Sequence, residues 1–80
     1  MIIKDLIKDK DYDYISWRTT PPSGWEDASI FLGACKSKNG ELISLDGDSY
    51  SEDEVVLGYE EWCNDNIKSG LTVIVEAEWY

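Results

Sequence analysis

The sequence contains no histidine, and this absence removes several kinds of catalytic and metal site. Histidine is the commonest general base near neutral pH and the commonest metal ligand, and it activates the nucleophile in Ser/His and Cys/His pairs. The two cysteines, Cys35 and Cys63, are too few for a zinc site, which needs four ligands. We therefore expect no enzyme activity, no bound metal and no cofactor.

Long hydrophobic runs are also missing. No stretch approaches the ~20 consecutive apolar residues of a membrane span, and Lys4 and Asp5 interrupt the N-terminus before a signal sequence could form. A chain of 80 residues supplies one small core, so we expect a single domain over residues 1–80. We expect it in the cytoplasm, where Cys35 and Cys63 remain free and buried or half-buried, unless the strands that carry them are neighbours.

Basic residues are almost absent from the second half of the chain. Residues 41–80 hold eleven acids against Lys68 alone, whereas residues 1–40 hold six of each sign, so the second half accounts for the whole net charge of −10. Such a charge disfavours direct binding to nucleic acid or to an anionic membrane. The asymmetry predicts one acidic lobe rather than a uniformly acidic surface.

The apolar periodicity of the first half predicts a short helix followed by strands. Apolar residues at helical spacing place a two-turn helix within residues 2–9, and alternation with aromatic and β-branched residues places a strand at 12–19. The run at 28–35 is almost continuously apolar, which is typical of a central strand covered on both faces. Asn39 and Gly40 then predict a hairpin turn that leads into a strand over residues 41–46.

The second half contains one ambiguous and one clear segment. Ser51 and Glu54 match a helix capping box, but the alternation from Val55 to Tyr59 and the presence of Gly58 favour a strand. Residues 71–80 form the clearest strand. A strand this apolar would aggregate at a free edge, so we expect it inside the sheet or in a homodimer.

Together these segments predict an α+β fold that is mostly β. We expect a short N-terminal helix and about five antiparallel strands, arranged as a bent sheet or as a small half-open barrel.

Acidic residues recur at two-residue spacing in the second half, as at Glu76 and Glu78. On one face of a strand this spacing is about 6.6 to 6.8 Å, close to the roughly 7 Å between successive phosphates of a nucleic acid strand. Such rows favour binding to the basic groove of a nucleic-acid-binding partner, although a solvated face that only keeps the protein soluble has the same pattern. The predicted contact residues are Glu41, Asp46, Asp48, Glu52, Asp53, Glu54, Glu60 and Glu61.

A second hypothesis places a site for a small ligand or nucleotide signal in the neutral half. Aromatic faces beside cations around the Pro21-Pro22 loop are typical of such a site. A buried Trp17 and a solvated Arg18 are the structural alternative. The predicted lining residues are Trp17, Arg18, Trp25, Lys36 and Lys38.

Several motifs also carry a family resemblance. They are Lys4-Asp5-Leu6-Ile7-Lys8, Asp11-Tyr12-Asp13-Tyr14-Ile15, Trp17-Arg18, Asn39-Gly40, Asp46-Gly47-Asp48-Ser49-Tyr50-Ser51, Tyr59-Glu60-Glu61-Trp62 and Gly70-Leu71-Thr72-Val73. With these motifs most of the chain resembles a family of small proteins carried by prophages and other mobile elements of Gram-positive bacteria. In size and charge it is similar to anti-CRISPR proteins. The resemblance implies an inhibitor, acting in the host cytoplasm, that blocks the nucleic-acid groove of a host effector protein.

Overall fold

We describe the fold from a computed structural model of the chain, over residues 1–19 and 30–76. These residues form one short helix and five strands, which confirms the predicted α+β, mostly β fold. The elements are α1 (Ile3–Ile7), β1 (Tyr14–Thr19), β2 (Ile30–Lys38), β3 (Glu41–Ser44), β4 (Val56–Trp62) and β5 (Gly70–Val75). The predictions for the Pro21-Pro22 loop, for Trp25 and for the end of the C-terminal strand fall outside the described residues.

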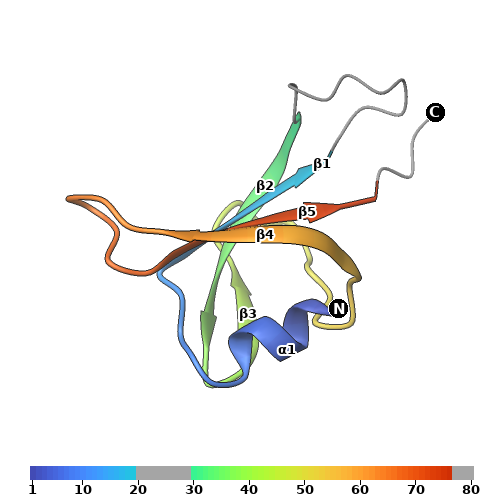
Figure 1. The fold of residues 1–80 in the computed structure, drawn as a ribbon, viewed down its shortest axis with the longest axis horizontal. Coiled ribbons are helices and arrows are strands. Elements are labelled where there is room, and N and C mark those ends of the chain that lie inside the picture. The colour runs from blue at the N-terminus through green and yellow to red at the C-terminus, as the bar shows by residue number, and fades with distance from the viewer. Residues whose placement is uncertain (20–29, 77–80) are drawn as a thin grey trace.

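The five strands form one open sheet in the order β3-β2-β1-β5-β4 (Figure 1). The pairs β1/β2, β2/β3 and β4/β5 are antiparallel, but β1 and β5 run parallel, so the prediction of an entirely antiparallel sheet is wrong for this pair. β5 lies between β1 and β4, as expected for the most apolar strand. Since β5 has a neighbour on each side, Gly70–Val75 offer no free edge through which two copies could pair.

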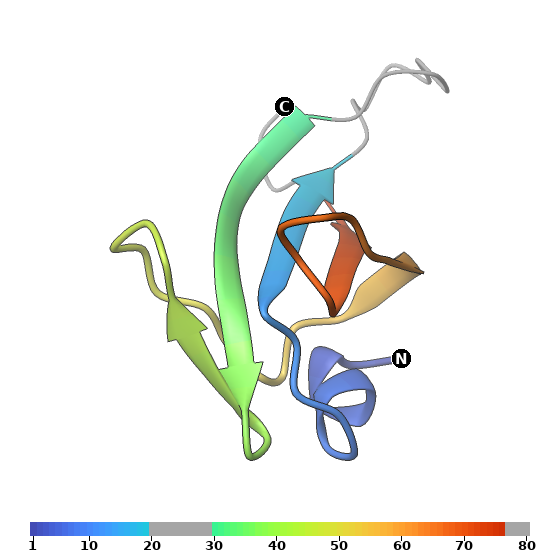
Figure 2. The same cartoon turned by 90° about the vertical axis from the view of Figure 1, so that its left-hand side faces the viewer.

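One face of the sheet is buried under α1. Successive residues of a strand point to opposite faces, and the register aligns Ile15 and Trp17 of β1 with Leu71 and Val73 of β5 on the same face. The helix lies beneath this face (Figures 1 and 2). The buried core consists of Ile3, Ile7, Tyr12, Ile15, Trp17, Cys35, Val56, Leu71, Val73 and Val75.

β2 differs from the central strand that its sequence predicts. Gly33, Ala34 and Cys35 are buried, but the first three residues, Ile30–Leu32, are exposed. The reason is that β3 pairs only with Cys35–Lys38 and leaves the first part of β2 beside no further strand of the described chain. The prediction of a strand covered on both faces is therefore wrong for the first third of β2.

The turn and strand predictions for residues 39–62 fare better. Asn39 and Gly40 have φ of 54° and 79°, the positive values that a type I′ hairpin turn requires. β3 ends at Ser44, two residues earlier than predicted, and β4 confirms the strand interpretation of the ambiguous segment. The Ser51 hydroxyl accepts a hydrogen bond from the Asp53 amide within a turn instead of capping a helix.

Both cysteines are free thiols, as predicted. Cys35 is buried in β2, whereas Cys63 follows β4 and is exposed, so the expectation of partial burial is wrong for Cys63. The two strands are not neighbours in the sheet. In the described part of the chain, no helix has the length and apolar character that crossing a membrane requires.

Candidate acidic interaction surface

Five of the eight predicted contact residues lie on one connection, residues 45–55, which we call the acidic loop. It joins β3 to β4 and therefore links the two edge strands of the sheet. Its acids are Asp46, Asp48, Glu52, Asp53 and Glu54. The three aspartates are exposed, and the two glutamates are half-buried.

Asp46 anchors the beginning of the acidic loop. Its Oδ2 accepts hydrogen bonds from the Tyr50 hydroxyl at 2.5 Å and from the Ala34 amide at 3.0 Å. Its Oδ1 accepts from the Asp48 amide at 3.0 Å and from the Ser44 hydroxyl at 3.1 Å. These donors, the Tyr50 hydroxyl foremost, hold the pKa of the Asp46 carboxyl well below its usual range. The carboxylate is therefore charged at neutral pH and fixed in position.

Tyr50 ties the same part of the acidic loop to the core. Its ring stacks on Trp17, with centroids 5.2 Å apart and planes at 27°. Burial, followed by the hydrogen bond to the Asp46 carboxylate, raises the pKa of the Tyr50 hydroxyl, so the phenol remains a donor. The loop thus wraps from the edge of β2 onto the buried face of the sheet.

The end of the acidic loop is held by the N-terminus of the chain. The Ile3 amide donates to the Glu54 carbonyl at 2.9 Å, and the Lys4 amide donates to the Glu52 carbonyl at 3.0 Å. The Glu52 carboxylate also accepts from the Leu42 amide of β3 at 3.4 Å. Hydrogen bonds at both ends therefore restrict the path of the loop backbone.

None of these carboxylates is neutralised by a salt bridge within the described residues. The salt bridge found there joins Lys10 Nζ to Glu61 Oε1 at 3.4 Å, outside the acidic loop. Among residues 1–19 and 30–76, the acids of the loop therefore have no ion-pair partner.

The other three predicted contact residues lie elsewhere. Glu41 begins β3, and Glu60 and Glu61 are successive residues of β4, so their side chains point to opposite faces of the sheet. The structure therefore divides the predicted lobe into the acidic loop and three separate acids.

The predicted rows of carboxylates along a strand are also absent from the described residues. Asp46 and Asp48 lie after the end of β3, and Glu52 and Glu54 lie in a turn region before β4. Glu76 follows β5, and Glu78 is outside the described residues. The match between strand spacing and phosphate spacing therefore does not apply to these acids.

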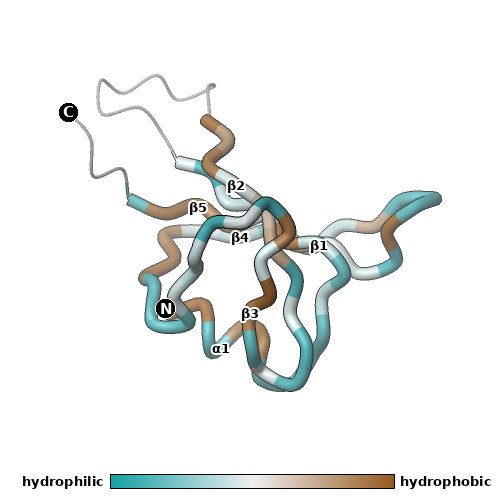
Figure 3. Tube along the Cα trace, turned by 180° about the vertical axis from the view of Figure 1, so that it is seen from behind, coloured by the Kyte–Doolittle hydropathy of each residue, from teal (hydrophilic) through white to brown (hydrophobic). Residues whose placement is uncertain are grey.

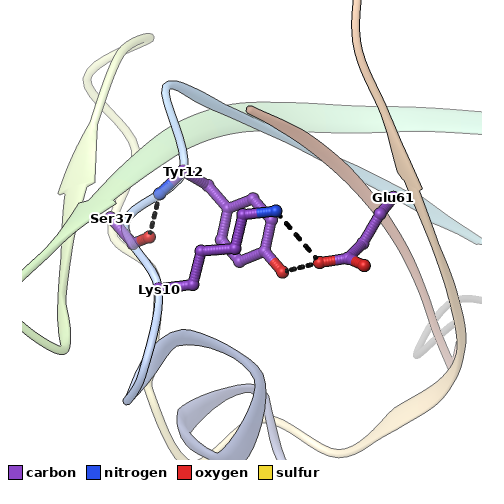
Figure 4. A network of polar contacts seen from close by, with 4 residues as sticks. All are labelled: Lys10, Tyr12, Ser37 and Glu61. Carbon is purple, nitrogen blue, oxygen red and sulfur yellow. Dashed lines mark hydrogen bonds and ion pairs between the residues drawn. The ribbon is translucent and has the colours of Figure 1, made fainter. Parts of the chain in front are cut away.

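Glu61 takes part in a structural network that also contains Lys10, Tyr12 and Ser37 (Figure 4). The buried Tyr12 donates its hydroxyl to Glu61 Oε1 at 2.5 Å, and its amide donates to Ser37 Oγ at 2.9 Å. The Tyr12 hydroxyl, followed by Lys10, lowers the pKa of Glu61. This network joins the segment before β1 to β4, so Glu61 has a role in the fold.

The residues of the predicted ligand site are not brought together. Trp17 is only 4% exposed and donates its indole N–H to Cys35 Sγ at 3.0 Å, so it belongs to the core. Arg18 follows Trp17 on β1 and lies on the opposite face, over the Phe31 ring at 5.9 Å. Lys36 and Lys38 are exposed on β2. Trp25 lies outside the described residues.

Sequence reasoning missed the residues that fix the acidic loop. Ala34, Gly33 and Tyr50 surround the Asp46 carboxylate, and they come from two segments that no local pattern connects. The only local indication was Tyr50, because an aromatic residue within a polar turn segment often packs against the core. The comparisons with known proteins found no matching family model, no matching curated protein and no matching solved structure.

Proposed function

We propose that the protein is a non-enzymatic inhibitor that binds a basic, nucleic-acid-binding surface of a partner protein through its acidic loop. The host is a bacterium in which the chain acts as a phage or mobile-element product, similar in size and charge to anti-CRISPR proteins. The partner is a nucleic-acid-binding effector of host defence. The chain itself does not contact nucleic acid, because its net charge of −10 repels phosphates.

The observation that carries the proposal is an acidic loop whose backbone and Asp46 carboxylate are held in place, and whose acids form no salt bridge with the described residues. Asp46 is fixed by four hydrogen bonds, and the Glu52 and Glu54 carbonyls are fixed by the N-terminal backbone. A surface that is ordered before binding loses less conformational entropy when a complex forms. Acids that form no salt bridge with the described residues can gain ion pairs in a complex, which favours a basic partner.

The distribution of charge supports the same partner. The acidic loop carries five acids and no base, so its local potential is more negative than that of the neutral first half. Such a patch steers a basic surface toward itself and raises the association rate at low ionic strength. A groove that holds nucleic acid phosphates has this basic character. No contact among the described residues favours the small-ligand alternative.

Charge reversal within the acidic loop tests the proposal. The tagged protein captures partners from a bacterial lysate at low and at high salt, and a mobility-shift assay then measures whether it displaces nucleic acid from the captured protein. We expect capture at low salt, loss at high salt and displacement by the native chain. The triple variant Asp48→Lys, Asp53→Lys and Glu54→Lys should lose both capture and displacement while remaining folded.

A matched variant separates the position of the charges from their number. Asp9→Lys, Asp13→Lys and Asp65→Lys change the net charge equally at exposed positions outside the acidic loop. This control should still capture and displace. Equal loss in both triple variants, or displacement by the loop variant, would contradict the proposal.

A further inference from the structure

Within the part of the chain that the structure describes, the first part of β2 has an unpaired outer edge. β3 covers that edge only along Cys35–Lys38, where its own four residues pair. Figure 2 shows β3 beside one end of the long, bent β2. Among the described residues, no strand pairs with Ile30–Gly33 on the side away from β1.

The acidic loop forms the boundary of this free edge. The Leu45 amide donates to the Ala34 carbonyl at 3.2 Å, and the Ala34 amide donates to the Asp46 carboxylate at 3.0 Å. Asp46 Oδ2 thus accepts the hydrogen bond from the Ala34 amide that the Leu45 carbonyl would accept if β3 continued. Pairing between β3 and β2 stops there, and no other strand of residues 1–19 and 30–76 covers the edge beyond Ala34.

The free edge is apolar as well as unpaired. Ile30, Phe31 and Leu32 are 39%, 49% and 43% exposed, and Leu45 at the boundary is 48% exposed. This end of β2 has hydrophobic colours in Figure 3. Proteins usually protect sheet edges with charges, prolines, β-bulges or a covering segment, because an exposed apolar edge pairs with other chains. The register between β1 and β2 shifts at Leu32, since Trp17 pairs with Gly33 and Arg18 with Phe31, but Ile30–Gly33 carry no charge and no proline. An edge left in this state is suited to strand addition by a partner.

We propose that Ile30–Gly33 bind an extended segment of a partner protein, which adds as a further strand outside β2. Apolar side chains of that segment pack against Phe31 and Leu32. A Lys or Arg at its end nearest Gly33 pairs with Asp46 and Asp48, whose carboxylates stand at the boundary of the edge. The segment therefore combines a short apolar strand with a basic end.

A second copy of this chain is a poorer occupant. Each copy carries a net charge of −10, so two copies repel each other. The apolar patch consists of a few half-exposed side chains, whereas a stable interface buries roughly 1,600 Å² in total. Strand addition needs less area because backbone hydrogen bonds supply part of the affinity.

This inference rests on the proposed function, because it assigns the extended segment to the same basic partner. It adds that the partner is held by backbone pairing next to the acidic loop and not by charge alone.

A synthetic peptide tests the edge directly. The probe is an extended peptide of ~8 residues that alternates valine with threonine and ends in two lysines. We expect it to shift the backbone amide resonances of residues 30–34 and of Asp46 and Asp48, and to slow amide hydrogen exchange at the edge. N-methylation of alternate peptide amides should weaken binding roughly tenfold, because the backbone donors are lost. Replacing the lysines by glutamates should abolish binding.

Two exposed leucines give matched variants of the protein. Leu32→Ser should weaken peptide binding, whereas Leu57→Ser, the same change at an exposed leucine of β4 (62% exposed, against 43% for Leu32), should leave it intact. Unshifted resonances at residues 30–34, or equal affinity for the N-methylated peptide, would overturn the inference. If partner capture still depends on the acidic loop while the peptide fails to bind β2, the proposed function stands without this site. If the peptide binds β2 while the charge-reversal variant of the acidic loop captures the partner as well as the native chain does, the proposed function fails instead.

Discussion

The hydroxyl of Tyr50 lies where a side chain on Gly33 would have to stand. A Cβ at Gly33 would fall well inside van der Waals contact with the Tyr50 oxygen and would also collide with the Asp46 carboxylate. The Tyr50 ring is meanwhile fixed by stacking on Trp17. The absence of a side chain at Gly33 thus allows the acidic loop to close over β2.

Gly33→Ala should therefore destabilise the protein, by about 1 to 3 kcal/mol, as is typical when a packed site receives an extra methyl group. Urea unfolding measures this change. Gly58→Ala is the control, because a Cβ there meets nothing within 4 Å, and it should alter stability little. In a double variant, Tyr50→Phe removes the colliding oxygen, so the two changes together should destabilise less than their sum. Strictly additive effects would refute this account of the contact.

The Asp46 carboxylate should make stability depend on acid pH. The pKa of the Asp46 carboxyl is low in the folded protein because the Tyr50 hydroxyl and nearby amides donate to it. In the unfolded chain an aspartate has a pKa of about 3.9. As the pH falls through that value, protons bind the unfolded chain first. The stabilisation is complete above about pH 5 and is lost progressively below it.

Asp46→Asn should remove this component. Urea midpoints measured between about pH 6 and pH 3 should fall less steeply for Asp46→Asn than for the native chain. Asp48→Asn removes one charge from the same turn, but the Asp48 carboxylate accepts no hydrogen bond from the described residues. The urea midpoints of this variant should therefore change with pH as those of the native chain do. Parallel curves for the native chain and Asp46→Asn would show that the hydrogen bonds of Asp46 do not stabilise the fold.

Local patterns predicted the elements of this fold better than their arrangement. The helix, the Asn39-Gly40 turn and the strand after Val55 follow from residue spacing and backbone preference, which act over a few residues. The parallel pairing of β1 with β5 joins segments far apart in the sequence. Alternation shows which side chains share a face but does not identify the neighbouring strand.

The same limit applies to the acidic residues. Their number predicted a negative surface, but composition does not distinguish Asp46, which accepts four hydrogen bonds, from Asp48, which has its carboxylate in solvent. Nor does it separate Glu60 from Glu61, because only the fold brings Tyr12 and Lys10 next to the Glu61 carboxylate. The exposed edge of β2 could not be predicted for a related reason. The apolar run at 28–35 does not indicate that the neighbouring strand β3 pairs only with Cys35–Lys38.

The network around Tyr12 provides a comparison between a buried and an exposed partner of Glu61. Tyr12→Phe removes a hydroxyl from a buried ring and should destabilise the protein by about 1 kcal/mol. Lys10→Ala breaks an ion pair whose side chains are 50% and 52% exposed, so it should change stability by less than about 0.5 kcal/mol. Urea unfolding of both variants gives the order. A larger effect for Lys10→Ala would mean that the ion pair, not the phenol, joins the segment before β1 to β4.

The two thiols should differ sharply in reactivity. Cys63 is exposed, whereas Cys35 is buried, and its burial raises the pKa of its thiol despite the Trp17 indole N–H that donates to Sγ. Since the thiolate is the reactive form, a water-soluble disulfide reagent should modify Cys63 at once and Cys35 only when the core opens. Absorbance should therefore report one fast thiol in the native protein and a second that appears with urea unfolding. Cys63→Ser should lose the fast phase alone. A fast phase that survives in Cys63→Ser would place Cys35 in contact with solvent and would contradict its packing against Trp17.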